Sequence, residues 1–182
     1  MNLDNLLIAL KKRGEANDVP NISLTNAKFL RDLIKIKKVK NALEIGTANG
    51  FSAINFALEL QKTNSKLTTI EFSLLSYNEA LKNFKDFQVL DYINSIHGNA
   101  IEVIPTLNEK FDFVFIDGMK KRTKDFLELV WDKVEDGGII IIDDVIKFEH
   151  KMIGLKDYLK DNQINYNIIP IDIDDGIIMI VK

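Results

Sequence analysis

Short apolar runs alternate with amphipathic stretches from about residue 42 to residue 160. The apolar runs have the length of strands, and five are strand candidates: Ala42–Ile45, Leu67–Glu71, Tyr92–His97, Phe111–Ile116 and Gly138–Ile142. Segments with apolar residues at helical spacing follow them: Ser52–Gln61, Ser76–Phe87, Ile101–Leu107, Thr123–Val134 and Phe148–Lys160. Such an alternation is typical of a parallel sheet with helices on both faces.

The two ends of the chain depart from this alternation. Two helical patterns, Leu3–Lys12 and Thr25–Lys37, come first. At the other end, an acidic link joins the apolar runs Tyr166–Ile171 and Gly176–Val181. The link is too short for a crossover helix, so we expect an antiparallel hairpin and, in total, a mostly parallel seven-stranded α/β sheet. The acids of the link are expected to be solvated turn residues rather than a Ca²⁺ site: Asp172, Asp174 and Asp175.

Length and composition restrict the class of protein. A chain of 182 residues fits one domain, with a helical region over 1–40 and a sheet over 41–182. The absence of Cys excludes disulfides and thiolate metal sites, and a net charge of −3 gives no general attraction to nucleic acid. Because no apolar run reaches the length of a membrane span and the N-terminus lacks a signal pattern, we expect a cytoplasmic protein without a membrane partner.

Two groups of charged residues directly follow strand candidates. Asp117 and Lys120 come after the fourth run, and Asp143 and Asp144 come after the fifth. Open α/β sheets bind ligands at the carboxyl ends of their strands. Three carboxylates without Cys or a nearby His predict a site for a hard cation such as Mg²⁺, Mn²⁺ or Ca²⁺, with Lys120 as a candidate base. The alternatives are a helix cap for the Asp pair and a solvated lysine.

The turn after the first strand predicts a nucleoside cofactor. Glu44, Gly46 and Gly50 lead into a helix with Ser52 near its start, and Glu71 ends the next strand. Glycines allow close approach to a ligand, and an acid in the position of Glu71 suits ribose hydroxyls. The third glycine of a dinucleotide motif is missing and Glu44 would repel a pyrophosphate, which favours S-adenosylmethionine. The alternative is a plain strand–helix turn with a solvated acid.

In this combination of motifs the chain resembles the cation-dependent O-methyltransferases. This family includes catechol and caffeoyl-CoA O-methyltransferases and bacterial tRNA 5-hydroxyuridine methyltransferases. The resemblance extends from about Pro20 to the C-terminus. It rests on several segments: Leu43–Ser52, Thr69–Glu71, His97–Ala100, Asp117 with Lys120, Asp143–Asp144, and Ile169–Gly176.

The resemblance implies a fold, ligands and residue roles. The fold would be the Rossmann-like class I methyltransferase fold, and a homodimer is a candidate assembly. Asp117, Asp143 and Asp144 would hold a divalent metal, and Lys120 would remove the proton of the acceptor hydroxyl. The residues implied to bind S-adenosylmethionine are Glu44, Gly46, Gly50, Ser52, Glu71, Phe72, Asn99, Ala100 and Asp117.

Two positions depart from the family pattern. Asn99 stands where the family often has Asp, and Asp144 stands where many relatives have Asn. A third carboxylate should bind a divalent ion at least as well, because it adds negative charge.

The acceptor and two other functional classes stay open at this point. Chelation by one metal requires a hydroxyl with an adjacent oxygen, which fits a small catechol-like acceptor. The alternative acceptor is tRNA with 5-hydroxyuridine, for which Lys121, Arg122 and Lys124 could contact phosphates. We favour the small acceptor, because the chain has no other RNA-binding signature. The other classes are a nicotinamide-dependent oxidoreductase and a non-catalytic nucleoside-binding module.

Overall fold

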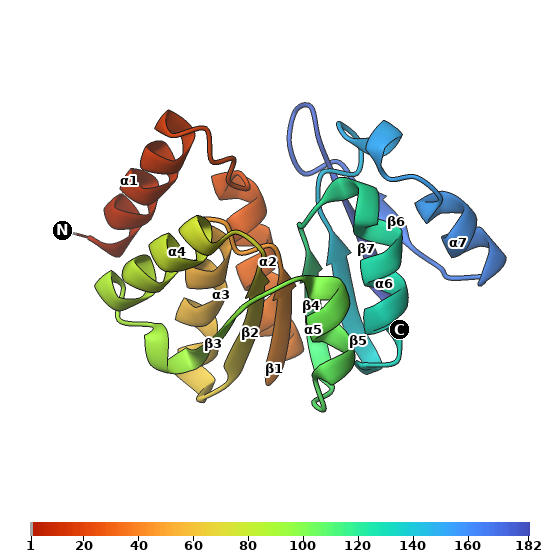
Figure 1. Ribbon diagram of the computed structural model, residues 1–182, viewed down its shortest axis with the longest axis horizontal. Coiled ribbons are helices and arrows are strands. Elements are labelled where there is room, and N and C mark those ends of the chain that lie inside the picture. The colour runs from red at the N-terminus through yellow and green to blue at the C-terminus, as the bar shows by residue number, and fades with distance from the viewer. Residues whose placement is uncertain (1) are drawn as a thin grey trace.

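The computed structural model describes residues 2–182. In this range seven strands form one mixed sheet in the order β3-β2-β1-β4-β5-β7-β6 (Figure 1). The strands are β1 (Asn41–Ile45), β2 (Lys66–Glu71), β3 (Ile93–His97), β4 (Phe111–Ile116), β5 (Val134–Ile142), β6 (Asn167–Ile169) and β7 (Ile177–Val181). Strands β1 to β5 pair in parallel, whereas β7 pairs antiparallel with both β5 and β6. The predicted sheet and its C-terminal hairpin are confirmed.

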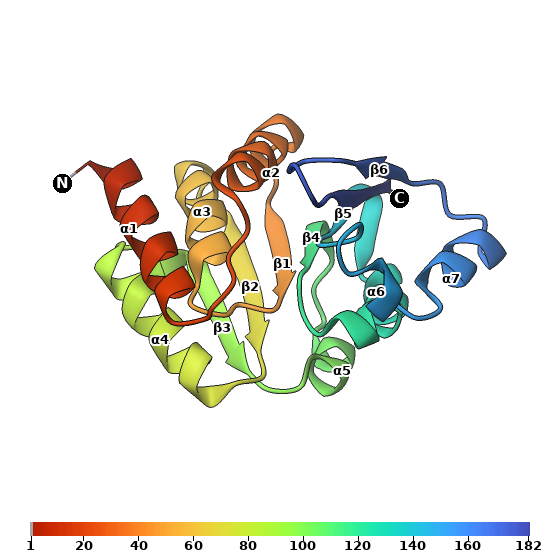
Figure 2. The same ribbon diagram turned by 90° about the horizontal axis from the view of Figure 1, so that it is seen from above.

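Helices cover both faces of this sheet. They are α1 (Leu3–Ala16), α2 (Leu24–Lys37), α3 (Phe51–Leu60), α4 (Leu74–Asp86), α5 (Ala100–Val103), α6 (Thr123–Trp131) and α7 (Leu155–Asp161). The first four pack on one face, and α5, α6 and α7 pack on the other (Figure 2). Over residues 2–182, none of these helices has both the length and the apolar character that crossing a membrane requires.

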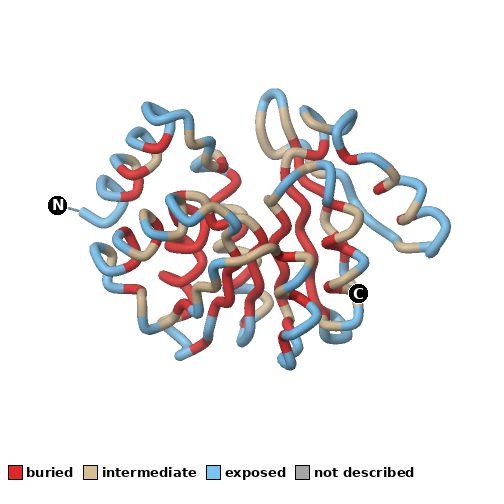
Figure 3. The backbone as a smooth tube through the Cα atoms, viewed as in Figure 1, coloured by how far each residue is buried: buried red, intermediate tan, exposed pale blue. Residues whose placement is uncertain are grey.

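The central strands supply side chains to two separate cores. In β4, Phe113 and Phe115 belong to the core under α2 and α3, whereas Val114 and Ile116 belong to the core under α6. Successive residues of a strand point to opposite faces, so a strand covered on both faces is apolar throughout. Phe56 of α3 packs edge-on against Phe113 and Phe115, with ring centroids 5.7 and 5.4 Å apart. Figure 3 shows the buried residues concentrated along these strands.

Several helices differ from the sequence prediction at their ends: α1 extends to Ala16 and α6 stops at Trp131. Two further differences have a local cause in the backbone. The helix expected from Phe148 begins only at Leu155, because Gly154 precedes it with φ +73° and left-handed backbone cannot continue an α-helix. The helix α5 ends at Val103 and passes into a 3-10 turn, earlier than expected. Pro105 explains this end, because it has no N–H to donate to the preceding turn.

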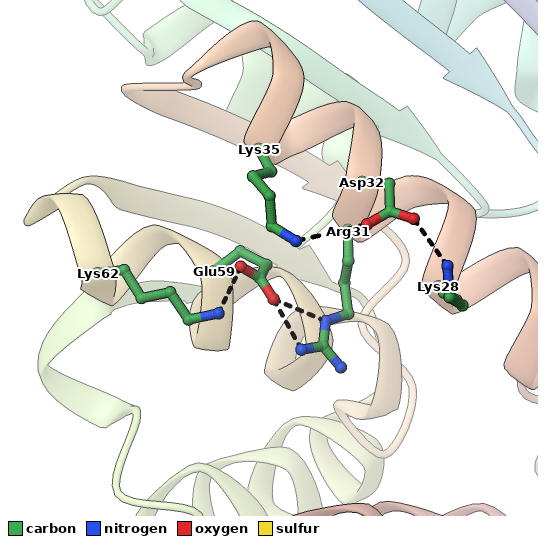
Figure 4. A network of polar contacts seen from close by, with 6 residues as sticks. All are labelled: Lys28, Arg31, Asp32, Lys35, Glu59 and Lys62. Carbon is green, nitrogen blue, oxygen red and sulfur yellow. Dashed lines mark hydrogen bonds and ion pairs between the residues drawn. The ribbon is translucent and has the colours of Figure 1, made fainter.

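A buried carboxylate joins α2 to α3 (Figure 4). Glu59 of α3 has a side chain that is 4% exposed, and its Oε1 accepts hydrogen bonds from Nε and Nη2 of Arg31 at 3.0 and 2.7 Å. Its Oε2 accepts from Lys62 Nζ at 2.6 Å. Burial opposes the charge of Glu59, but these two cations outweigh it and hold the pKa of Glu59 below its ordinary value. The N-terminal helix α2 is thereby fixed to the helix that covers β1.

Removal of one partner from this buried pair should destabilise the fold. We expect Arg31→Ala to lower the free energy of unfolding by about 2 kcal/mol, because it leaves Glu59 buried with one cation instead of two. The control is Lys28→Ala on the same helix, whose exposed pair with Asp32 should be worth less than about 0.5 kcal/mol. Urea unfolding of both variants measures the difference, and equal losses would contradict the role of the buried pair.

Candidate active site

A cavity of about 690 Å³ opens at the carboxyl ends of β1, β2, β4 and β5. Strand β1 lies between β2 and β4, so the connections leave this point in opposite directions, as at the ligand sites of other open α/β sheets. Most of the predicted site residues line the cavity: Gly46, Ser52, Glu71, Phe72, Asn99, Ala100, Asp117, Lys120, Asp143 and Asp144. The two others, Glu44 and Gly50, lie behind its wall.

The two glycines of the turn after β1 have different positions. Gly46 has φ +97°, and a Cβ there would lie 2.7 Å from the carbonyl oxygen of Asp117. Gly50 has φ +87° and is the N-cap of α3, where a Cβ would lie 2.6 Å from Cε1 of Phe84. Gly46 therefore allows contact between the turn and the end of β4. Gly50 serves the packing of α3 on α4 and does not face the cavity.

Glu71 holds the turn in shape. Its Oε2 accepts hydrogen bonds from the backbone N–H groups of Thr47 and Ala48, at 3.0 and 2.8 Å. Its Oε1 accepts from the N–H of Ser73 at 2.8 Å. A carboxylate has about four lone-pair positions, so these three donors leave little further capacity. No local sequence signal marks this structural role of Glu71.

Glu44 is buried beneath the same turn. Its Oε2 accepts a hydrogen bond from the Thr69 hydroxyl at 2.5 Å, and Thr69 also contacts the hydroxyl of Thr47. Burial raises the pKa of Glu44 to about 8, and the nearby hydroxyls of Ser52 and Thr69 offset this only in part. Glu44 is therefore mostly neutral at pH 7. The expectation that its charge repels a pyrophosphate is wrong. The missing third glycine is then the only feature of this turn that argues against a dinucleotide.

The wall nearest β3 consists of residues at the ends of β2 and β3. Phe72 is 71% exposed, and its carbonyl oxygen lies 3.1 Å from Nε2 of His97. Asn99 caps α5, since its Oδ1 accepts from the N–H of Ile101 at 3.1 Å, and Ala100 is buried behind it. This wall thus combines an exposed aromatic ring with a helix start.

The opposite end of the cavity holds the acidic cluster, which we define as Asp117, Asp143 and Asp144. One oxygen of each carboxylate lies within 4.8 Å of the others. Lys120 Nζ is 2.6 Å from Oδ1 of Asp117 and 2.7 Å from Oδ2 of Asp144. The structure therefore brings together the four residues that the sequence placed after two separate strands.

The charges of this cluster are not balanced. Burial and the charges of Asp117 and Asp144 raise the pKa of Asp143 well above its ordinary value. Burial also raises the pKa of Asp144 to about 6, although Lys120 opposes this rise. For Lys120, burial would lower the pKa, but Asp117 and Asp144 outweigh it and the pKa is raised. Three oxygen donors with excess negative charge fit a hard divalent cation.

Two further residues support the cluster. Asn26 of α2 is buried, and its Nδ2 donates to Oδ1 of Asp143 at 2.9 Å. Asp175 was expected to be a solvated turn residue, and that expectation is wrong. It is half-buried, and its Oδ1 accepts from the N–H groups of Ile146 and Lys147, both at 3.2 Å, which fixes the loop after Asp144. Neither contact has a local sequence signal, because each joins distant parts of the chain.

Comparisons with a family profile and with individual relatives point to the same protein family. A sequence profile of the O-methyltransferase family matches residues 3–182. The catechol O-methyltransferase of Niastella koreensis is 33% identical over 150 residues, which are 79% of this chain and 67% of that protein. A provisionally named caffeoyl-CoA O-methyltransferase of Arabidopsis thaliana is 32% identical over 142 residues, 76% of this chain and 60% of that protein. The chain thus spans about three fifths to two thirds of these relatives.

Solved structures show the same architecture. A provisionally named caffeoyl-CoA O-methyltransferase of Staphylococcus aureus has a TM-score of 0.85 at 27% identity, covering 97% of this chain and 92% of that one. The O-methyltransferase of Bacillus cereus in complex with S-adenosylhomocysteine has a TM-score of 0.86 at 24% identity, covering 100% and 93%. These comparisons confirm the resemblance predicted from the motifs: the chain belongs to the O-methyltransferase family and is similar to its catechol and caffeoyl-CoA O-methyltransferases.

Proposed function

We propose that the protein is a divalent-metal-dependent O-methyltransferase that uses S-adenosylmethionine and acts on a small catechol-like acceptor. The observation that carries this proposal is the acidic cluster beside Lys120 at one end of the cavity. Family membership and the names of the relatives support it. The same membership disfavours a nicotinamide-dependent oxidoreductase and a non-catalytic nucleoside-binding module.

The cofactor would occupy the end of the cavity at the turn after β1. Gly46 and Glu71 line this end, with Ser52 in the first turn of α3, where helix N–H groups favour a carboxylate. Phe72 and Asn99 line the adjoining wall and would contact the nucleoside. When bound, S-adenosylmethionine supplies a methyl group on a sulfonium. The S-adenosylhomocysteine bound to the Bacillus cereus protein supports this choice of cofactor.

The metal would be held by the acidic cluster, with Mg²⁺, Mn²⁺ and Ca²⁺ as candidates. When bound, such a cation would supply Lewis-acid positive charge at this end of the cavity. Asp117 is shared between the two ends, because its backbone packs against Gly46 while its carboxylate belongs to the cluster. The cofactor and the acceptor would therefore be oriented by one rigid strand end.

Lys120 is proposed to take the acceptor proton on Nζ. In the arrangement described here it is a charged counterion of Asp117 and Asp144, which stabilise its protonated form. A base must be neutral before it can accept a proton, so this role requires a less negative cluster. The contacts of Nζ with Asp117 and Asp144 support this role, because they hold the lysine beside the proposed metal site.

The lining of the cavity favours a small acceptor. Met119 and Phe126 contribute apolar surface next to the cluster. If tRNA were the acceptor, the basic side chains beside the cavity would have to be free to contact its phosphates. However, Arg122 is paired with Asp125 at 3.0 Å and Lys124 with Glu128 at 3.6 Å, which weakens the local positive field.

The proposed function is tested by methyl transfer with and without metal. We expect S-adenosylhomocysteine to form from catechol-type diols and activity to disappear in excess chelator. Asp143→Asn should lower kcat/KM at least about 100-fold, because it removes a charged oxygen from the proposed metal site. The control Asp125→Asn changes an acid on α6 outside the cluster and should keep activity. Full activity in excess chelator would disprove the proposed requirement for a metal.

The base role of Lys120 makes a separate prediction. Lys120→Met should lower kcat by about 10² to 10⁴, as expected for loss of a general base. Binding of Mn²⁺ should persist or tighten, since the variant removes a competing cation from the cluster. Kinetics and metal titration of this variant are compared with Lys121→Met, which changes an exposed neighbour. An unchanged kcat in Lys120→Met would disprove the base role.

The choice between small acceptor and tRNA is tested at the exposed cations. The double variant Lys121→Gln with Lys124→Gln should methylate a catechol within about twofold of the wild-type rate, because neither residue lines the cavity. If tRNA with 5-hydroxyuridine were the acceptor, the double variant would lose activity and its salt dependence would flatten. Methylation of such tRNA but not of catechols by the wild type would reverse our preference.

A further inference from the structure

The contact between Asn26 and Asp143 joins the N-terminal helices to the acidic cluster. Asn26 is 1% exposed and Asp143 is 6% exposed, so the hydrogen bond of 2.9 Å between them is shielded from water. The two residues are 117 positions apart in the chain. Only folding of the whole chain brings these two residues into contact.

The orientation of the Asn26 amide follows from its partner. With Asn26 Nδ2 facing Oδ1 of Asp143, the amide donates to the ionised carboxylate, which is the form that binds a cation. With Nδ2 facing Asp143, the Oδ1 of Asn26 has no hydrogen-bond partner among residues 2–182. The backbone N–H of Asn26 donates to the Ser23 hydroxyl at 2.9 Å, which fixes the residue at the start of α2.

The asparagine has both a cost and a gain at this position. Its buried carbonyl without a donor opposes folding, whereas its N–H satisfies a buried carboxylate oxygen that an apolar side chain would leave unpaired. The helix start is already capped by Ser23, so the side chain of Asn26 is not needed there. What the amide does provide is a neutral donor to the most buried carboxylate of the acidic cluster.

We propose that Asn26 is a positioning residue of the metal site, an inference that rests on the proposed function. By engaging Oδ1 of Asp143, it fixes the rotation of that carboxylate and leaves Oδ2 as the oxygen available to a cation. Partners that orient metal-ligating side chains in this way typically change metal affinity by about 10- to 100-fold. The residues just before α2, namely Pro20, Asn21 and Ile22, line the cavity, so the same anchor also holds this wall beside the metal site.

The test is a calorimetric titration with Mn²⁺. We expect Asn26→Ala to raise the Mn²⁺ Kd about tenfold or more, while the Kd for S-adenosylmethionine stays within about twofold. The matched control is Asn55→Ala, which removes an amide that is 3% exposed and donates to the Phe51 carbonyl at 2.8 Å within α3. This control should lower the melting temperature without changing Mn²⁺ affinity.

The outcomes separate this inference from the proposed function. Unchanged Mn²⁺ affinity in Asn26→Ala, with normal binding by the wild type, would overturn the positioning role and leave the metal site intact. No Mn²⁺ binding by the wild type would overturn both. Should Asn26→Ala fail to fold, Asn26→Ser keeps a small polar side chain that is too short to reach Asp143. The same tenfold loss is expected from it, and unchanged affinity would equally overturn the inference.

Discussion

The site depends on the close approach of two strand ends at Gly46. The backbone N–H of Asp117 donates to the Ile45 carbonyl at 2.9 Å, and the N–H of Gly46 donates to the Ile70 carbonyl at 3.0 Å. Between these bonds no space remains for a side chain on Gly46, because its Cβ would lie 2.7 Å from the Asp117 carbonyl oxygen. This contact sets the distance between the turn held by Glu71 and the carboxylate of Asp117. The two ends of the cavity are thus parts of one rigid unit.

Around that unit, the acidic cluster is held against its own repulsion. Three carboxylates gather where burial already opposes their charge, and Lys120 compensates for part of it. Neighbours prevent the side chains from turning away: Asn26 holds Asp143 from α2, and Asp175 holds the loop after Asp144 from the hairpin. An arrangement that is unfavourable by itself but fixed by its surroundings is typical of a functional site. The flanking helix α2 and the C-terminal hairpin therefore hold the acidic cluster in place as well as contributing to the fold.

The sequence predicted the sheet well because its central strands are buried on both faces. Such strands are continuous apolar runs, and β4 shows this in Phe113 to Ile116. The carboxylates were predictable for the same reason, since they stand directly after those runs. Asn26 and Asp175 were not, because their partners lie far away in the chain and no periodicity marks them. The late start of α7 had a visible signal in Gly154, which the helical pattern outweighed.

Glu44 and Glu71 belong to the same sequence motif but have different roles in the structure. Both are acids near the ends of neighbouring parallel strands, and Glu44 pairs in register with Thr69, two positions before Glu71. That difference in register decides their chemistry. Glu44 lies within the sheet, beneath the turn, where burial raises its pKa to about 8 and the Thr69 hydroxyl satisfies one oxygen. Glu71 lies past the last core residue of β2, reaches the cavity and binds the turn amides. The acid before the first glycine therefore supports the turn from below, whereas the acid after the second strand holds the turn amides at the cavity wall.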